Sequence, residues 1–131
     1  MERLINIGFK KVGQWLLEND QIILSLESEN KTTNILYSFI SNGSILYIGK
    51  TVQPLKKRMY GYQNPGPTQS TNIKNNRFIT EKLINGDSVD IYALPDNGLL
   101  HYGGFHVNLA AGLEDSLVSV LKPTWNQSGV S

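Results

Sequence analysis

The sequence predicts a small α/β protein, an α+β sandwich in which a mostly antiparallel three-stranded central sheet is flanked by helices. Three observations support this fold class. A length of 131 residues is enough for one domain with a hydrophobic core and too short for two. Apolar residues make up 40% of the chain and charged residues 18%, which is typical of a globular protein. Two β-branched and aromatic runs flank an Asn-Gly turn, and helical patterns follow them.

The beginning of the chain indicates an extension packed onto a core domain. Apolar residues recur at roughly helical spacing over residues 4–18, which predicts a short helix. Residues 21–26 predict a strand, and the polar stretch 27–34 predicts a loop. We therefore expect an N-terminal helix–strand extension over residues 1–30 and a core domain over residues 31–131.

The core domain is expected to begin with a hairpin of residues 35–40 and 44–48. Its register decides where two tyrosines point. A two-residue Asn-Gly turn would pair Tyr37 with Ile48 and send Tyr37 and Tyr47 to opposite faces. A three-residue loop would pair Tyr37 directly with Tyr47 on one face. The sequence permits both registers, and only the second lets the two phenols act together.

Three helices and a strand are expected to complete the core domain. Pro54 predicts a helix of about two turns, because proline suits the first helical position. Asn108 can cap a final helix that Pro123 ends. Trp15 and Trp125 are expected to be core anchors. The remaining predicted elements are a helix over residues 76–85, a strand over 88–94, a Gly-rich loop over 95–108 and the final helix over 109–121.

Composition excludes several kinds of site. The chain has no cysteine, which excludes disulfides, thiolate zinc sites and thiol nucleophiles and fits an intracellular, cytoplasmic protein. No apolar run approaches the ~20 residues of a membrane helix, and the N-terminus lacks the pattern of a signal peptide. His101 and His106 cannot form a metal site alone, and we expect a structural or incidental role for them. The net charge of +1 indicates no particular partner.

Two helices carry a charged residue on a face that is otherwise apolar. Glu114 falls within the apolar arc of the final helix, where a buried carboxylate must be paired, protonated or bound to a metal. Alternatively, Glu114 lies at the edge of the arc and reaches solvent or an arginine. Arg58 lies beside Leu55 on the inner stripe of its helix, which marks an anion or a carboxylate partner. A structural pair with Glu114 or a snorkelling side chain would also explain Arg58.

A cleft that holds these charged residues and the two tyrosines suits phosphodiester hydrolysis. Glu114 can hold one Mg²⁺, whose other positions take water and a phosphate oxygen. Arg58 can stabilise the extra charge on the pentacoordinate phosphate. Tyr37 or Tyr47 can accept a proton from the attacking water. The ordinary phenol pKa is about 10, so this step needs a nearby cation, for which Lys50 and Arg58 are available.

Five segments of the chain form an ordered set of motifs: ILY at 35–37, YIGKT at 47–51, LKKR at 55–58, LEDSLV at 113–118 and LKPTWN at 121–126. In these segments, the sequence resembles the GIY-YIG nuclease superfamily. The YIG half-motif is present at residues 47–49, whereas ILY stands for the GIY half-motif and keeps its tyrosine but not its glycine. The similarity covers residues 34–126, and the motifs occur in the family's order.

The resemblance implies roles for individual residues. Glu114 would be the single Mg²⁺ or Mn²⁺ ligand, and Arg58 would bind the scissile phosphate. Tyr37 and Tyr47 would be paired phenols, either of which can be the general base, and this pairing requires the three-residue loop. Tyr62, four residues after Arg58, would form a hydrogen bond near the nucleophile or the phosphate.

Other residues would support this site. Lys50 would help to lower the pKa of a tyrosine, and Gly49 and Asn126 would support the site structurally. Arg58 lies one residue beyond the direct match of some relatives, which would be Lys57. We prefer Arg58 because it keeps the family's four-residue spacing to the following tyrosine.

The implied partner is DNA, with no role for a membrane. Basic residues gather in two acid-free stretches, which suit either a phosphate footprint or a solvated surface. Residues 62–77 are rich in Asn, Gln, Ser and Thr, which suits groove and phosphate contacts or a surface loop. Cutting both strands needs two active sites or two visits, which a homodimer would provide. The candidate DNA-binding residues are Lys50, Lys56, Lys57, Lys74 and Arg77.

Three functions compete on this reading of the sequence. The favoured one is a metal-dependent DNA endonuclease that leaves a 5′-phosphate and a 3′-hydroxyl. The second is a catalytically impaired nucleic-acid-binding module on the same scaffold, which the missing glycine of the first motif motivates. The third is a structural or toxin-like interaction protein. The third function predicts that four residues are dispersed in space: Tyr37, Tyr47, Arg58 and Glu114.

Overall fold

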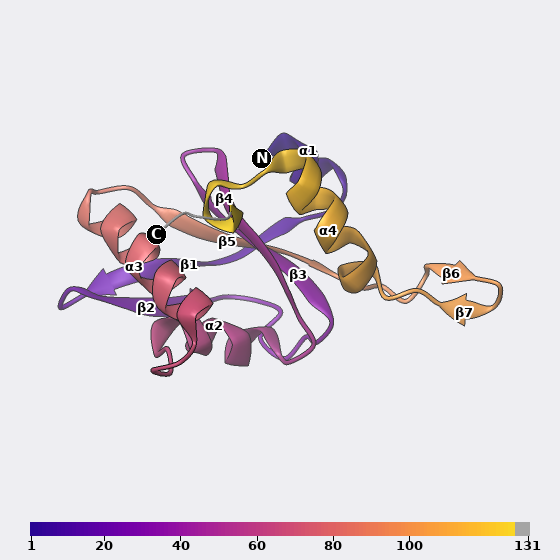
Figure 1. Cartoon of the computed structure of the whole chain (residues 1–131), viewed down its shortest axis with the longest axis horizontal. Coiled ribbons are helices and arrows are strands. Elements are labelled where there is room, and N and C mark those ends of the chain that lie inside the picture. Colours follow the sequence, from indigo (N-terminus) through magenta and orange to yellow (C-terminus); the bar gives the residue numbers. More distant parts are fainter. Residues whose placement is uncertain (128–131) are drawn as a thin grey trace.

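The computed structural model describes residues 1–127, and residues 128–131 of the predicted core domain lie outside this part. The helices are α1 (Glu2–Asn6), α2 (Leu55–Gln63), α3 (Ser70–Ile84), α4 (Leu109–Leu121) and the 3₁₀ helix η1 (Thr124–Asn126). The strands are β1 (Lys10–Glu18), β2 (Gln21–Leu26), β3 (Ile35–Ser41), β4 (Ser44–Thr51), β5 (Val89–Pro95), β6 (His101–Tyr102) and β7 (Phe105–His106). The five longest strands form one antiparallel sheet in the order β2–β1–β5–β3–β4, and the small β6–β7 hairpin projects from the body (Figure 1).

The α+β sandwich class is confirmed, but the sheet has five strands rather than three. The helix predicted over residues 4–18 is wrong, because α1 is short and β1 occupies most of this stretch. The pairing of β1 with β5 shifts between Lys11 and Gly13, which makes Val12 the extra residue of a β-bulge. The bulge lets Val12 and Trp15, three residues apart, enter the same core. Their spacing therefore resembles that of a helix.

The predicted N-terminal extension contributes directly to the central sheet. Strand β1 pairs with β2 on one side and with β5 on the other. Leu4 of α1 and Phe9 lie in the hydrophobic core that α4 also covers. Residues 1–30 are thus packed on the rest of the chain through hydrogen bonds and through core contacts. The division of the chain at residue 30 stays a prediction.

The β3–β4 hairpin has a register that differs from both registers considered above. Asn42 and Gly43 have φ values of 51° and 77°, so both adopt the left-handed conformation of a two-residue turn. The pairing then shifts next to Phe39, which makes Leu46 the extra residue of a second β-bulge. The hairpin therefore combines a two-residue turn with a bulged strand.

The expected pairing of Tyr37 with Tyr47 is therefore wrong. Tyr37 pairs with Gly49, and Phe39 pairs with Tyr47. The two phenols still share a face, because the extra residue at Leu46 changes the alternation of side chains along β4. Their ring centres lie 6.3 Å apart.

The helices of the core domain agree with the sequence in two cases and differ in one. Pro54 precedes the first residue of α2, and Asn108 caps α4 by accepting a hydrogen bond from the N–H of Ala111 at 3.2 Å. Helix α3 begins at Ser70, well before the predicted start at residue 76, so much of the expected surface loop is helical. Within residues 1–127, no helix has the length and apolar character needed to cross a membrane.

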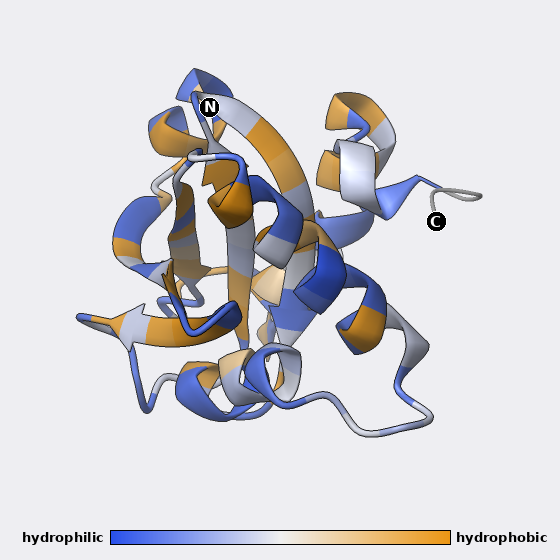
Figure 2. Cartoon of the chain, turned by 90° about the vertical axis from the view of Figure 1, so that its left-hand side faces the viewer, coloured by the Kyte–Doolittle hydropathy of each residue, from blue (hydrophilic) through white to orange (hydrophobic). Residues whose placement is uncertain are grey.

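Two hydrophobic cores lie on the two faces of the sheet. The first is covered by α2 and α3, and the second by α1 and α4. Strand β3 is buried along its whole length and supplies residues to both cores. Figure 2 shows hydrophobic segments concentrated in the strands and hydrophilic segments in the connecting loops. Trp15 and Trp125, which are 2% and 5% exposed, lie in the first core as predicted.

Candidate active site

Side chains from β3 and α2 meet in a hydrogen-bonded cluster in the first core. The hydroxyl oxygens of Tyr37 and Tyr62 lie 2.5 Å apart. Nη2 of Arg58 donates to the Tyr62 hydroxyl at 2.8 Å, and its guanidinium carbon lies 4.2 Å from the centre of the Tyr62 ring. Arg58 and Tyr62 are one turn apart on α2, which places them side by side. Three predicted site residues are thus brought together.

Gly49 makes room for the Tyr37 ring. The two residues are cross-strand partners in β3 and β4. A β-carbon on Gly49 would lie 2.6 Å from the Tyr37 hydroxyl oxygen and 2.7 Å from the ring carbon that carries it. Both distances are shorter than van der Waals contact. A larger residue at position 49 would therefore displace the phenol, which is a physical reason for glycine here.

Tyr47 completes the aromatic cluster from the neighbouring strand. Its ring centre lies 6.4 Å from that of Tyr62, and its ring stacks on Phe39 at a centre-to-centre distance of 5.8 Å. Tyr37 and Tyr62 are fully buried, whereas Tyr47 is half-buried. Of the three phenols, Tyr47 therefore has the greatest access to solvent.

Burial sets the proton affinity of these phenols. It raises the pKa of Tyr37, Tyr47 and Tyr62 above the usual value, and the charge of Arg58 opposes part of the increase. Burial also works against the charge of Arg58, but the neighbouring phenols raise the pKa of this group. At neutral pH the cluster therefore consists of neutral phenols around one charged guanidinium.

A second chain of hydrogen bonds holds the other side of the guanidinium. Nη1 of Arg58 donates to Oδ1 of Asn72 at 2.9 Å. Nδ2 of Asn72 donates to Oε1 of Gln69 at 3.0 Å, and the N–H of Gly66 donates to the same oxygen at 2.9 Å. The sequence-based site does not include Asn72 or Gln69, because their segment suits DNA contacts or a surface loop and contains no motif that singles them out. Reading a helix from residue 70 would have placed Asn72 on its inner face.

Glu114 lies on α4, which packs against the edge strand β4. Its side chain is 21% exposed, and Oε1 lies 3.9 Å from Nζ of Lys50. Burial raises the pKa of Glu114, and the charge of Lys50 opposes this effect. Burial is also the main cause of the raised pKa of Tyr47, and the charge of Glu114 adds to it. The carboxylate is therefore within electrostatic reach of the Tyr47 phenol.

Lys50 and Arg58 act on different groups. Lys50 contacts Glu114. Burial raises the pKa of Tyr37 and Tyr47, and Arg58 is the cation that opposes this increase.

Glu114 has the chemistry of a ligand for a single hydrated cation. Among the described residues, no group of three or more His, Cys, Asp or Glu side chains gathers to form a protein metal cage. Mg²⁺ does not need such a cage, since it keeps several waters and binds one or two carboxylates plus substrate oxygens. This side chain therefore fits one Mg²⁺ or Mn²⁺ ion.

Asn126 joins η1 to the backbone of β4. Its Oδ1 accepts a hydrogen bond from the N–H of Ile48, and its Nδ2 donates to the Ile48 carbonyl, both at 2.8 Å. Strand β4 is the edge of the sheet, where backbone groups lack a partner strand. Because Ile48 lies between Tyr47 and Gly49, Asn126 holds the segment that carries both residues.

Four of the five predicted DNA-binding residues lie on helices α2 and α3, and the fifth, Lys50, lies on β4. Lys57 lines a hollow of about 720 Å³ beside Arg58. Lys56 is exposed on the same helix, while α3 carries the half-buried Lys74 and the exposed Arg77. Of these residues, only Lys57 lines the hollow beside Arg58, and Lys50 is engaged with the α4 carboxylate described above.

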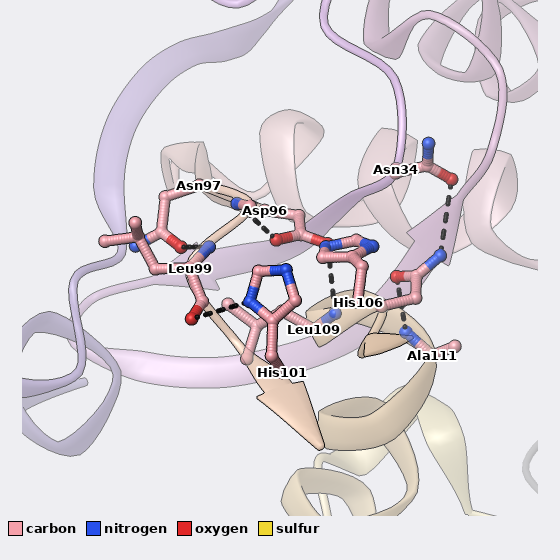
Figure 3. A network of polar contacts seen from close by, with 10 residues as sticks. Asn34, Asp96, Asn97, Leu99, His101, His106, Leu109 and Ala111 are labelled. Carbon is pink, nitrogen blue, oxygen red and sulfur yellow. Dashed lines mark hydrogen bonds and ion pairs between the residues drawn. The ribbon is translucent and has the colours of Figure 1, made fainter. Parts of the chain in front are cut away.

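The two histidines belong to a separate polar network at the start of α4 (Figure 3). Nε2 of His106 lies 3.0 Å from Oδ2 of Asp96, and the N–H of Leu109 donates to the same oxygen at 3.2 Å. A hydrogen bond from the N–H of Gly98 is the main cause of the lowered pKa of Asp96. His101 lies beside the carbonyl oxygen of Leu99 at 3.3 Å. These contacts connect the β6–β7 hairpin to α4, which is a structural arrangement.

Comparison with known proteins gives structural matches only. No family model and no curated protein matches the sequence. A mutant of EndoII from bacteriophage T4 is similar, with 24% identity, a TM-score of 0.75 and coverage of 96% of both chains. The restriction endonuclease HPY188I in complex with product DNA is also similar, with 17% identity, a TM-score of 0.56 and coverage of 98% of this chain and 82% of that chain. The chain therefore shares its fold with these two endonucleases, in agreement with the fold expected from its motifs.

Proposed function

We propose that this protein is a metal-dependent DNA endonuclease that hydrolyses phosphodiester bonds. One observation carries the proposal: Arg58 donates to Tyr62, Tyr62 contacts Tyr37, and the Tyr47 ring packs against both tyrosines. Glu114 is within electrostatic reach of Tyr47. The fold supports it, since one similar structure is a restriction endonuclease bound to product DNA. The contacts among Tyr37, Tyr47 and Arg58 through Tyr62 disfavour the third function, which expects these residues to be dispersed.

Arg58 is suited to bind the scissile phosphate. Its two Nη atoms donate to neutral acceptors, the Tyr62 hydroxyl and the Asn72 amide oxygen. Within residues 1–127, no carboxylate forms an ion pair with Arg58, and Glu114 pairs with Lys50 instead. A half-buried guanidinium without an anionic partner attracts an anion strongly. On DNA, this charge would stabilise the phosphate as the attacking oxygen adds to it.

The phenols would handle the proton of the attacking water. Tyr37 or Tyr47 would accept this proton as the general base. Tyr37 is tied to Tyr62, whereas Tyr47 is more accessible to water, so the two phenols are not equivalent. Arg58 favours the phenolate form of both, which makes proton transfer easier than burial alone would allow.

Glu114 would hold one Mg²⁺ or Mn²⁺ ion. When bound, the ion would supply positive charge that neutralises the reacting phosphate and its leaving group. Lys50 would contribute a second positive charge near the same carboxylate. Gly49 and Asn126 would act structurally, the first by admitting the Tyr37 ring and the second by fixing β4.

The wider partner would be a DNA strand that passes over α2 and α3. Exposed lysines and the hollow beside Arg58 favour phosphate contacts along this path. Cutting both strands would require a homodimer or two successive visits by one molecule. Sedimentation on DNA and nick mapping would separate these two cases. We also infer an intracellular, cytoplasmic location, which cell fractionation would test.

Plasmid nicking tests the proposed activity. Wild-type protein with Mg²⁺ is expected to convert supercoiled DNA to the nicked form, leaving 5′-phosphate and 3′-hydroxyl ends. Glu114→Ala should lose this activity, because the only proposed metal ligand is gone. Asp115→Ala is the matched control, since Asp115 is the exposed neighbour on the same helix and should behave as wild type.

The alternative function is a nucleic-acid-binding module that has lost catalysis. The missing glycine of the first half-motif favours it, since position 35 holds isoleucine. Strong DNA binding without cleavage by the wild type, in both Mg²⁺ and Mn²⁺, would establish this alternative and overturn the endonuclease.

A further inference from the structure

One fully buried amide beside the phenol cluster has no hydrogen-bond partner. Asn75 is 0% exposed, and neither its Nδ2 nor its Oδ1 forms a hydrogen bond with any described residue. Buried polar groups are almost always paired, because an unpaired one keeps the cost of losing water. An asparagine in this position therefore needs an explanation.

Asn75 belongs to the inner face of α3 that supports Arg58. The buried residues of this helix are Asn72, Asn75, Phe78 and Ile79. Their spacing puts Asn75 one turn after Asn72, whose amide oxygen accepts the hydrogen bond from Arg58. The inner face is thus polar where it meets the cluster and apolar one turn later.

The amide of Asn75 lies beside the Tyr47 phenol. Burial is the largest influence on the pKa of Tyr47 and raises it, while Tyr62, Arg58 and Asn75 act in the opposite direction. Asn75 is therefore close enough to interact with the Tyr47 oxygen, although its amide does not reach hydrogen-bond geometry.

We propose that Asn75 is a positioning residue of the cleavage site, which holds the Tyr47 hydroxyl toward the attacking water once DNA is bound. This inference rests on the proposed endonuclease function and adds a residue that the sequence motifs do not contain. Leucine has the same number and branching of side-chain heavy atoms as asparagine and would extend the apolar face formed by Phe78 and Ile79. A purely structural position would therefore favour leucine, whereas a position that acts on Tyr47 requires the amide.

The test compares Asn75→Leu with Ser41→Ala in plasmid cleavage and thermal unfolding. Ser41 is the matched control, because its Oγ is also buried and unpaired but lies at the far end of β3. Both variants remove an unpaired buried polar group, so both should keep or raise the melting temperature. Asn75→Leu should lower kcat about 10-fold or more with KM within about twofold, and Ser41→Ala should leave both unchanged. If Asn75→Leu fails to fold, Asn75→Ala takes its place.

A double-mutant cycle with Tyr47→Phe shows whether Asn75 acts through Tyr47. The proposal predicts that Asn75→Leu has no further effect on kcat in the Tyr47→Phe background. Wild-type kcat in folded Asn75→Leu, or a full additional loss in the double variant, would overturn the role of Asn75 and leave the endonuclease intact. A wild-type protein that does not cleave DNA at all would overturn both proposals.

Discussion

The two faces of the central sheet differ in chemical character, although the same strand, β3, contributes side chains to both. On the face under α1 and α4, β3 contributes Leu36 and Ile40 to an apolar core. On the face under α2 and α3, the same strand contributes Tyr37, whose hydroxyl meets Tyr62 and, through it, Arg58. One face of β3 is built for stability alone, whereas the other places polar groups in a core.

The polar face carries a cost that the apolar face does not. Desolvation opposes every charged form in the cluster, and Asn75 remains unpaired. Each unpaired buried polar group costs about 1–3 kcal/mol, so this arrangement lowers stability. Proteins commonly accept such costs where activity requires them. The contrast between the faces is therefore itself an argument for function.

Replacing Arg58 should produce the largest difference between the faces. Arg58→Ala is expected to lower DNA cleavage about 10³-fold, because the phosphate loses its main protein cation. Ile40→Val, on the opposite face of β3, should cost about 0.5–1.5 kcal/mol of stability and leave cleavage unchanged. Plasmid-cleavage rates and chemical unfolding measure the two effects. Equal cleavage by both variants would remove the functional distinction between the faces.

Replacing the phenols should separate their roles. Of the variants Tyr37→Phe and Tyr47→Phe, the one that removes the general base should lower the cleavage rate about 10²–10⁴-fold. The other variant should lower the rate less. Burial raises the pKa of both phenols, so little phenolate exists at neutral pH. The wild-type rate should therefore rise with pH across the neutral range, by up to about tenfold per pH unit. This rise should disappear in the variant that lacks the base. Rates that keep the wild-type pH dependence in both variants would exclude a tyrosine base.

Gly49→Ala should disturb the polar face without removing a functional group. The added β-carbon would meet the Tyr37 hydroxyl, so the phenol must move away from Tyr62. Cleavage should fall about 10²-fold, as is typical when a reacting group is misplaced by about 1 Å. Gly112→Ala is the control, because its nearest neighbour is a side chain 4.0 Å away and alanine stabilises helices. An active Gly49→Ala protein would show that the Tyr37–Tyr62 contact is dispensable.

Glu114→Gln should stabilise the protein while abolishing cleavage. The pKa of Glu114 is raised in the folded state, so its ionisation disfavours folding. This penalty grows as pH rises from the unfolded-state pKa toward the folded-state pKa and is fully present above the latter. The melting temperature of Glu114→Gln should thus exceed that of wild type at neutral pH. The two values should converge below the unfolded-state pKa, where both side chains are neutral. A lower melting temperature of the variant at neutral pH would mean that Lys50 compensates the charge fully.

The smallest effect is expected at the β6–β7 hairpin. His106→Ala removes a half-exposed imidazole from its contact with Asp96, and pairs with one partner in solvent contribute about 0–1 kcal/mol. Cleavage by this variant should stay within about twofold of wild type, because the network holds the start of α4 and not the phenols. A large loss of cleavage would instead connect the hairpin to the active site.

Two β-bulges explain where sequence reasoning failed on the fold. The hairpin, α2, β5 and α4 follow from turn residues, proline and the N-cap asparagine, which act locally. The bulges at Val12 and Leu46 depend on pairing with distant strands, and each changes the alternation on which a strand is recognised. The bulge at Val12 led to the wrong prediction of a helix, and the bulge at Leu46 led to the wrong prediction of the hairpin register. Tyr37 and Tyr47 nevertheless lie on one face, as the three-residue loop would have required, because the bulged residue shifts the side chains as the longer loop would have done.

Some residues of the candidate site could be identified from the sequence, and others depend on contacts between distant segments. The tyrosines, Arg58 and Glu114 are identifiable because they interrupt apolar patterns or match a motif. The sequence does not identify three further residues of the site, because an asparagine or a glutamine does not stand out within a polar segment. These residues are Gln69, Asn72 and Asn75. Their positions depend on α3, whose first turns form through burial against α2 rather than through helix propensity.

The central claim is that Arg58, the phenols and Glu114 form one metal-dependent site. Its most direct test is a crystal structure of the protein with cleaved DNA and Mn²⁺, in which anomalous scattering locates the ion. The account predicts one Mn²⁺ bound to Glu114, with the 5′-phosphate of the product contacting both this ion and Arg58. A Mn²⁺ ion away from Glu114, or a product phosphate that contacts neither Arg58 nor the ion, would contradict it.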